Sequence, residues 1–390
     1  MDGRTPKHRS SPVATLGEGE LLRLGEWVRD VSLSLGDGSL TNPLEAMLFH
    51  EALTAAIDTL EARQSMREAM QRHSGHEDVS APALPISLAD TAQQIIDRAF
   101  ADDFSGPPPE TEQTACIHFA LKLDPWCSDA YVIQGSLDER AGRYPQAQAA
   151  YEQAMAQAAE KFGPDAFAEK SRKAEHMHFW YSSGTREYMR PRAALASLLW
   201  QKMGQLKEAI AHFQAMLTLN PGDNQGNRDA LLCCLLEAGD DEALGKALAD
   251  WHFDTRETIE PQDIAGSVWH YTHACWLFCT HSTSAESAVR NVATTALRKA
   301  FRYNQYVPRF LLAPQGLPGL HELAPYALGD PTEAVMYVNL ALKGWQKTTG
   351  TLAWLETTAR QAQLLPTGHK GGRREPIIVS VVAPRPGEER

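Results

Sequence analysis

ALASLLWQKMGQLKEAIAHFQAMLTLNP, residues 194–221, decides the fold class, because it has the pattern of two helices joined by a tight turn. An aromatic residue lies just before a turn glycine, and small and apolar residues then recur at helical spacing. A proline, which cannot continue a helix, closes the stretch. The marker residues are, in order, Trp200, Gly204, Leu206, Ala209, Phe213, Asn220 and Pro221.

The order aromatic, Gly, Ala, Phe and Pro is the pattern of the tetratricopeptide repeat, a helical hairpin of about 34 residues. One hairpin cannot bury its apolar face alone, so neighbouring hairpins must stack on it. Further hairpins are indicated at 129–160 and after Pro221, and divergent helix pairs at 264–279 with 285–303 and 331–346 with 351–364. The sequence therefore predicts an all-α, tetratricopeptide-like α-solenoid that winds as a right-handed superhelix.

Other segments frame this array. Residues 18–35 and 42–71 have helical patterns, whereas four prolines between 307 and 329 predict a loop. Residues 163–185 are an insertion between two hairpins. We predict four parts: a disordered N-terminus at 1–18, a helical N-terminal region at 19–80, the solenoid at 88–365 and a flexible basic tail at 366–390.

The composition limits the classes of function. The chain has 390 residues and a formal net charge of -12, which argues against a general affinity for nucleic acid or an anionic membrane. No stretch approaches the roughly 18 apolar residues of a membrane span, and no secretory signal is visible. The cysteines lie mostly in apolar helical runs without regular spacing, so we predict reduced thiols and a cytoplasmic protein. They are Cys116, Cys127, Cys233, Cys234, Cys275 and Cys279.

Longer stretches resemble bacterial tetratricopeptide proteins related to the suppressor-of-tumorigenicity-7 family. They are LKLDPWCSDAYV at 121–132, GTREYMRPR at 184–192, LNPGDNQGNRDALL at 219–232, FRYNQYVPRFLL at 301–312 and the segment 329–355. Glu187 and Pro191 depart from the usual pattern, and the membrane segments of animal relatives are missing. The resemblance implies the fold and an expectation of protein interaction, and it supplies no reaction and no catalytic residues.

The first helix of each hairpin is expected to line a concave groove for a partner. The predicted groove residues are Val132, Ile133, Ser136, Ala194, Leu195, Leu198, Asp229, Ala230 and Cys233. Because most are apolar, they disfavour the clamp of Lys, Asn and Arg with which co-chaperone members of the superfamily hold a peptide carboxylate. Such a groove could bind an amphipathic helix or an extended peptide. It could equally be filled by the chain's own N-terminal helices or by residues 377–382.

Polar residues at the groove edge form a second candidate set. They are Arg186, Tyr188, Arg190, Asn227 and Arg228. The arginines of 185–192 could bind an acidic partner or a phosphate, but pairing with Asp and Glu of adjacent helices is the favoured interpretation. Residues 222–228 have the composition of a helix-capping turn, which leaves Asn227 and Arg228 as candidates for ligand contact.

Catalysis and metal binding have weaker support. Residues 269–281 hold three histidines and two cysteines, but Cys275 and Cys279 share one helix face while His270 and His273 lie on nearly the opposite one. We therefore predict no metal and no cofactor. The usual motifs of hydrolases, zinc proteases and dinucleotide-binding enzymes are missing from the sequence, so we predict that the chain is not an enzyme.

The favoured function is a cytoplasmic interaction adaptor, scaffold or chaperone-like protein that binds a segment of another protein in its groove. The alternative is a structural or regulatory subunit of a larger complex, which docks through its N-terminal helices. A metal-binding protein or an enzyme is the third hypothesis.

Overall fold

All regular elements in the described part of the chain are helices, as predicted. The structure is a computed structural model, and it describes residues 16, 18–35, 43–74, 87–100, 108–167, 179–180, 183–250, 266–281, 287–320, 323 and 327–365. Contacts divide the chain after Gly163 into two units, residues 1–163 and 164–390. The division falls inside the single array predicted over 88–365. The tail with its run at 377–382, and most of 1–18, lie outside the described residues.

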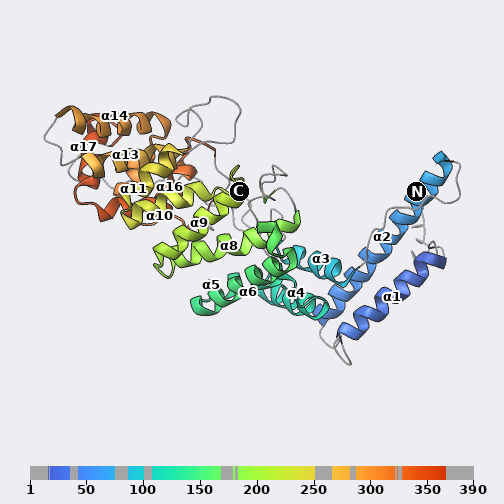
Figure 1. Cartoon of the computed structure of the whole chain (residues 1–390). Helices are drawn as coiled ribbons and strands as arrows, with labels where there is room; N and C mark the ends of the chain where they lie inside the picture. The colour runs from blue at the N-terminus through green and yellow to red at the C-terminus, as the bar shows by residue number, and fades with distance from the viewer. Residues whose placement is uncertain are drawn as a thin grey trace, which may run out of the picture. The chain divides into compact units, whose positions relative to one another are not determined.

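The first unit consists of three successive helix pairs (Figure 1). The helices are α1 (Glu18–Leu35), α2 (Pro43–Ser74), α3 (Leu88–Phe100), α4 (Glu110–Leu123), α5 (Ser128–Arg140) and α6 (Tyr144–Phe162). Both α1 and α2 contact α3 and α4 as well as each other. One apolar core runs from Leu16 to Leu137. The N-terminal helices are therefore part of the same packed unit as the first hairpins.

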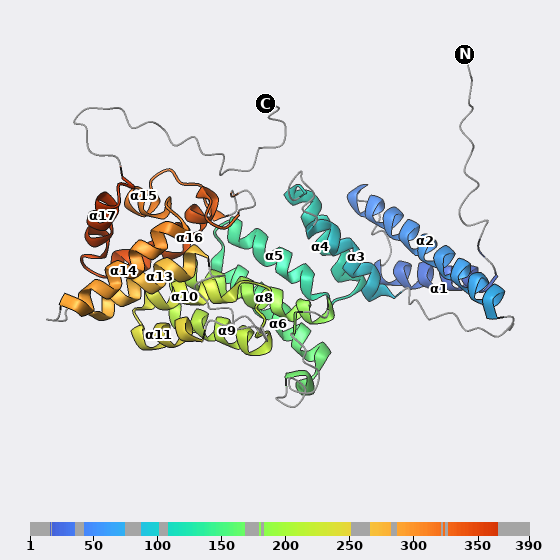
Figure 2. The same cartoon turned by 90° about the horizontal axis from the view of Figure 1, so that it is seen from above.

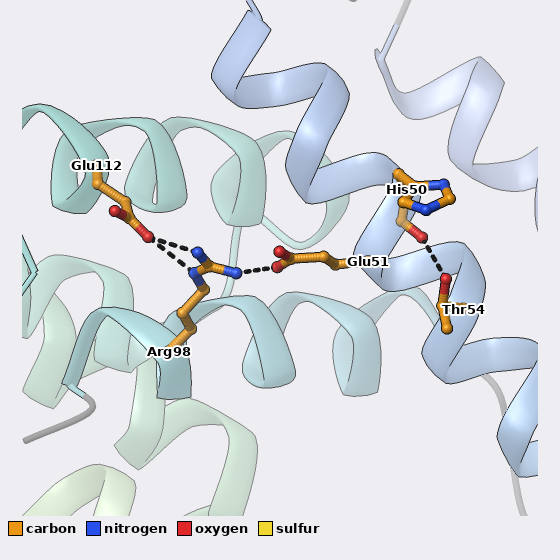
Figure 3. A network of polar contacts seen from close by, with 5 residues as sticks. All are labelled: His50, Glu51, Thr54, Arg98 and Glu112. Atoms are coloured by element: carbon orange, nitrogen blue, oxygen red, sulfur yellow. Dashed lines mark hydrogen bonds and ion pairs between the residues drawn. The ribbon is translucent and has the colours of Figure 1, made fainter. Parts of the chain in front are cut away.

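Polar contacts at the edges of this core hold α2 to the helices that follow it. The Arg98 side chain of α3 lies between Glu51 of α2 and Glu112 of α4 (Figure 3), and its Nη2 is 2.7 Å from the Glu112 carboxylate. Lys122 of α4 donates to Glu45 of α2 at 3.0 Å. These ion pairs are partly exposed, so each adds little stability alone.

The hairpin of α5 and α6 has the close helix approach expected of a tetratricopeptide repeat. A Cβ on Gly135 would lie 2.4–2.9 Å from ring atoms of Tyr151, which is buried. Only glycine therefore fits at this crossing. Gly142, at φ +74°, makes the turn between the two helices, in the region that favours glycine.

The second unit continues with helical hairpins. Its elements are η3 (Pro164–Phe167), α8 (Ser183–Gln201), α9 (Leu206–Leu219), α10 (Asn227–Ala238), α11 (Asp241–Ala249), α13 (Ser267–His281), α14 (Ser287–Tyr303), α15 (Val307–Leu312), α16 (Pro331–Lys347) and α17 (Thr351–Gln361). Consecutive helices contact each other from α8 to α11, and α13 packs on both α11 and α14.

The hairpin on which the fold prediction rests is formed by α8 and α9. The Trp200 and Phe213 rings meet edge to face at 6.2 Å, and Gly204 makes the turn at φ +69°. The first helix begins at Ser183, well before the Ala194 start that the repeat pattern indicates. The segment 185–192 is thus helical and includes Pro191, rather than being a lead-in to the hairpin.

Helix α10 of the second unit contacts α9, α11, α13 and α16 (Figure 2). Its residues 231–236 are all buried, and six consecutive residues cover every face of a helix. On the α16 side, a Cβ on Gly344 would lie 2.7 Å from Leu236 Cγ. Lys347 donates to the carbonyls of Glu237 and Ala238, which ends α10 with a cation at its negative pole.

The predicted loop over 307–329 is wrong in its first part, because residues 307–312 form the short helix α15. Pro308 lies in the first turn, where a missing N–H costs nothing, and the side chains of Val307, Phe310 and Leu311 are buried. Proline content alone therefore misidentified a helix start as a break.

A buried carboxylate joins α13, α14 and α16. Glu333 is 1% exposed, and its oxygens accept from the N–H of Ser267 at 2.7 Å, the N–H of Gly329 at 2.6 Å and Asn304 Nδ2 at 3.0 Å. A Cβ on Gly266 would lie 2.7 Å from Glu333 Oε1. The two C-terminal stretches that carry the family resemblance thus meet at one hydrogen-bonded carboxylate.

Candidate functional site

A pocket of about 410 Å³ opens in the second unit between α9, α10 and α11. Its volume lies in the range of small-ligand sites. The lining residues are Gln214, Leu217 and Thr218 of α9, Pro221 of the following turn, Arg228, Leu231 and Leu232 of α10, and Ala243, Lys246, Ala247 and Asp250 at α11.

The floor of this pocket is apolar. Leu231 and Leu232 of α10 are buried at 6% and 1% exposure, so the floor is rigid core. On α11, Ala243 and Ala247 lie one turn apart on the pocket side. Their small side chains leave the space that larger residues would fill.

The rim is polar and carries two cations and one carboxylate, Arg228, Lys246 and Asp250. Arg228 donates to the carbonyl of Pro221, and its Nη1 is 3.9 Å from Asp223 Oδ2. Lys246 is exposed and makes no ion pair with a described residue. Beside the apolar floor, the rim thus offers two exposed groups of opposite charge, Lys246 and Asp250.

The turn between α9 and α10 fixes Arg228 at the rim. Asp223, at φ +51°, accepts from the N–H of Asn227 at 2.7 Å and from the N–H of Arg228 at 2.9 Å. This is the helix cap that the composition of 222–228 predicts, with Asp223 as the capping residue. Asn227 is buried, so of the two ligand candidates only Arg228 reaches the pocket.

Asp229 follows directly and lies in an acidic environment. Burial raises the pKa of its carboxyl to about 7, and the charges of Asp223 and Glu333 raise it further against the opposing effect of Arg228. Asp229 therefore takes up a proton near neutral pH in the folded chain.

The other predicted groove residues lie mainly in the protein interior. Leu195, Leu198 and Cys233 are at most 1% exposed, and Val132 and Ile133 are also buried. Ser136, Ala194 and Ala230 are half-buried. None of these buried side chains lines the pocket between α9, α10 and α11, so the predicted groove surface needs correction: its leucines are packing residues.

The predicted edge at 185–192 packs on aromatic residues. Arg186 donates to the carbonyl of Trp180 at 2.9 Å, and its guanidinium lies 5.1 Å from the Trp180 ring centroid. Tyr188 is buried against Phe167, with centroids 4.9 Å apart. Arg190 is half-buried. For Arg186, the observed partners are an aromatic ring and a carbonyl, whereas the favoured interpretation expected carboxylates.

The histidines of α13 lie apart from its two cysteines, as helical geometry indicates, and the Cys275 and Cys279 thiols contact each other. The His273 ring packs on Trp269 at 4.7 Å, and burial lowers its pKa to about 4. Cys279 Sγ instead lies 3.3 Å from Thr348 Oγ1. Among the described residues, no group of three or more His, Cys, Asp or Glu side chains is arranged to hold a metal ion.

Sequence reasoning missed the α11 side of the pocket. A signal was present in DEALGKALA, residues 241–249, where Ala243 and Ala247 make a strip of small residues beside Lys246. We expected the first helix of each hairpin to be the contact surface, so this second helix was not considered.

One of the comparisons with known proteins assigns the chain to a family. A family model described as ST7 protein matches residues 107–375. A search of curated proteins finds no match. None of the described helices combines the length and apolar character that crossing a membrane requires.

Proposed function

The chain belongs to the ST7 protein family, and on that premise we propose that it is a protein-interaction scaffold, rather than an enzyme, that holds a segment of a partner protein against its helical hairpins. Its fold of stacked hairpins is of a kind that offers surfaces for such binding. The six cysteines, which all lie among the described residues, form no disulfide, which supports the cytoplasm as its compartment.

The observation that carries this proposal is the pocket between α9, α10 and α11. It has a rigid leucine floor, an open mouth and polar groups at the rim. A partner's apolar side chain can be desolvated there while its flanking residues contact the rim, which is the arrangement of an interaction hot spot.

Filling the pocket tests the proposal. Ala247→Trp places a large side chain in the pocket, whereas Ala249→Trp places it on an exposed position of the same helix that does not line the pocket. Both variants and the wild type are used as bait in the native host, with circular dichroism as a check of folding. We expect at least one partner to be lost with Ala247→Trp and retained with Ala249→Trp. Identical partners for all three baits would contradict the proposal.

Docking through the N-terminal helices has one observation in its favour. Leu22 and Leu33 of α1 are 67% and 74% exposed, and their spacing of eleven residues puts them on one helix face. Removing residues 1–80 would also remove part of the first unit's core, so truncation is a poor test. The double substitution Leu22→Ser and Leu33→Ser leaves the core intact. A partner that is lost with this variant but retained with the pocket variant Ala247→Trp would favour docking through the N-terminal helices.

A further inference from the structure

We infer that α1 pairs antiparallel with α1 of a second copy of this chain, through the side of the helix that faces away from the core. The four residues that form this side, which we call the outer stripe, are Leu22, Glu26, Arg29 and Leu33. The pocket between α9, α10 and α11 takes no part in this pairing. The inference therefore goes beyond the proposed function and does not rest on it.

The outer stripe is one continuous face of α1. Its residues follow each other at spacings of four, three and four. Because a helix turns by about 100° per residue, they share an arc of about 60°. The opposite face is turned into the core of the first unit, and its apolar residues are at most 8% exposed. These core residues are Leu24, Trp27, Val31 and Leu35.

The apolar ends of the outer stripe are unusual for a helix in this position. Helix α1 packs on α2, α3 and α4 and is the first described helix of the stack. A helix at the end of a stack ordinarily carries a polar outer face, because no further hairpin covers it. Here Leu22 and Leu33 are 67% and 74% exposed, so the outer stripe has the character of a contact surface.

The order of residues in the outer stripe is self-complementary. The two leucines are equally far from the middle of the stripe, and so are Glu26 and Arg29. A two-fold axis through this midpoint reverses the second helix and gives both copies the same contact surface. Leu22 then lies opposite Leu33 of the second copy, and Glu26 comes within reach of Arg29 of the second copy. Two leucine contacts at the ends therefore enclose two ion pairs in the middle.

The charges favour both this occupant and this orientation. A parallel pair would place Glu26 opposite Glu26 and Arg29 opposite Arg29, and like charges oppose association. The antiparallel pair replaces both repulsions by attractions. Arg29 already contacts the neighbouring Asp30 at 3.5 Å, with both side chains more than half exposed. Its guanidinium has five N–H donors, so it can bind a second carboxylate as well.

Sedimentation velocity of the purified full-length chain over about a hundredfold concentration range tests the pairing. Because one pair of helices buries a small area, we expect a weak dimer with a dissociation constant in the micromolar range. The double substitution Leu22→Ser and Leu33→Ser should raise this constant more than tenfold, because each leucine is used twice in a symmetric dimer. Leu328→Ser removes a leucine of the second unit that is 61% exposed and should leave the constant unchanged.

Exchanging the charges tests the orientation. Glu26→Arg and Arg29→Glu should each raise the dissociation constant about tenfold, because either change makes both ion pairs like-charged. A mixture of these two variants should form a heterodimer about as strong as the wild-type dimer, because opposite charges face each other again. Glu160→Arg changes the net charge as Glu26→Arg does, at an exposed position of α6, and should have no effect. Circular dichroism checks that every variant is folded.

The results that would overturn the inference are definite. They are a wild-type chain that stays monomeric over the whole range, and a dimer that the leucine variant leaves intact. Single charge variants that associate as strongly as the wild type, or a mixture that does not restore the dimer, would overturn the antiparallel arrangement. None of these results affects the proposed pocket, because it is formed by other helices.

Discussion

One polar contact between helices can be compared in each of the two units, and the two contacts differ in how deeply they are buried. In the first, partly exposed ion pairs such as Arg98 with Glu51 and Glu112 join helices at the edge of an apolar core (Figure 3). In the second, the buried carboxylate of Glu333 takes N–H donors from α13, from α14's C-terminal end and from the turn before α16.

The two kinds of contact differ in how much stability the protein loses when they are removed. Exposed ion pairs are screened by salt and can be lost at small cost, whereas a buried carboxylate leaves several unsatisfied donors when it is removed. The stretches 301–312 and 329–355, which carry the family resemblance, meet at the buried carboxylate. The identity of Asn304 and Glu333 in these stretches is thus explained by the hydrogen bonds that they make.

The largest effect is expected from Glu333→Ala. The N–H groups of Ser267 and Gly329 and the Asn304 amide would lose their acceptor inside the protein, at a cost of about 3–5 kcal/mol. Urea unfolding gives the magnitude, and hydrogen exchange should place the loss in α13 and α16. Glu356→Ala removes an exposed carboxylate paired with Arg360 in the same unit and should cost less than 1 kcal/mol. Similar losses for both variants would abolish the contrast between buried and exposed contacts.

Glycine substitutions test whether packing is local at the α5–α6 crossing and long-range at the α10–α16 crossing. Gly344→Val would force α16 away from Leu236 of α10, and Gly135→Val would displace Tyr151 within one hairpin. Both should cost about 2–3 kcal/mol. Faster hydrogen exchange should spread over α10, α13 and α16 in the first case and stay within α5 and α6 in the second. The same extent of spreading for both would show that the distinction is wrong.

Asp229→Asn tests the acidic environment of the second unit through pH. The folded pKa of Asp229, about 7, lies above the usual value near 4. The folded chain therefore binds this proton more tightly than the unfolded chain, and stability falls as pH rises from about 4 to about 7. We expect the variant to be about 1–2 kcal/mol more stable than the wild type at pH 8 and similar at pH 4. The exposed Asp250→Asn serves as control, and an equal gain there would refute the assignment to Asp229.

The smallest effect is expected from Arg98→Ala in the first unit. The arginine side chain is 36% exposed and contacts two carboxylates, so the loss should be about 1 kcal/mol and should shrink further in high salt. Urea titrations at two salt concentrations measure this. A loss above 3 kcal/mol that salt does not change would place Arg98 with the buried contacts.

Those parts of the structure that local patterns determine can be predicted from the sequence alone. Trp200, Gly204 and Phe213 predict the α8–α9 hairpin, and the composition of 222–228 predicts the cap that Asp223 supplies. The family resemblance was equally accessible, because it rests on stretches that are continuous in the chain.

The pocket and the depth of burial could not be predicted in this way. Leu198 and Leu232 have the same apolar character in sequence, yet one is enclosed and the other forms a pocket floor, because the neighbouring helices differ. Helix α10 looked like an ordinary first helix of a repeat. The burial of its residues 231–236 on every side depends on α16, which local periodicity does not reveal.

That dependence has a consequence for how the protein is made. Lys347, which ends α10 by binding its last carbonyls, lies 110 residues after Glu237. In a regular repeat array each hairpin can consolidate as soon as its neighbour exists, and the first unit can do so early in translation. Helix α10 must instead wait on the ribosome, with part of its leucine surface exposed, until α16 has been synthesised. Between the synthesis of these two helices, exposed leucine surface makes the nascent chain prone to aggregation and a substrate for chaperones.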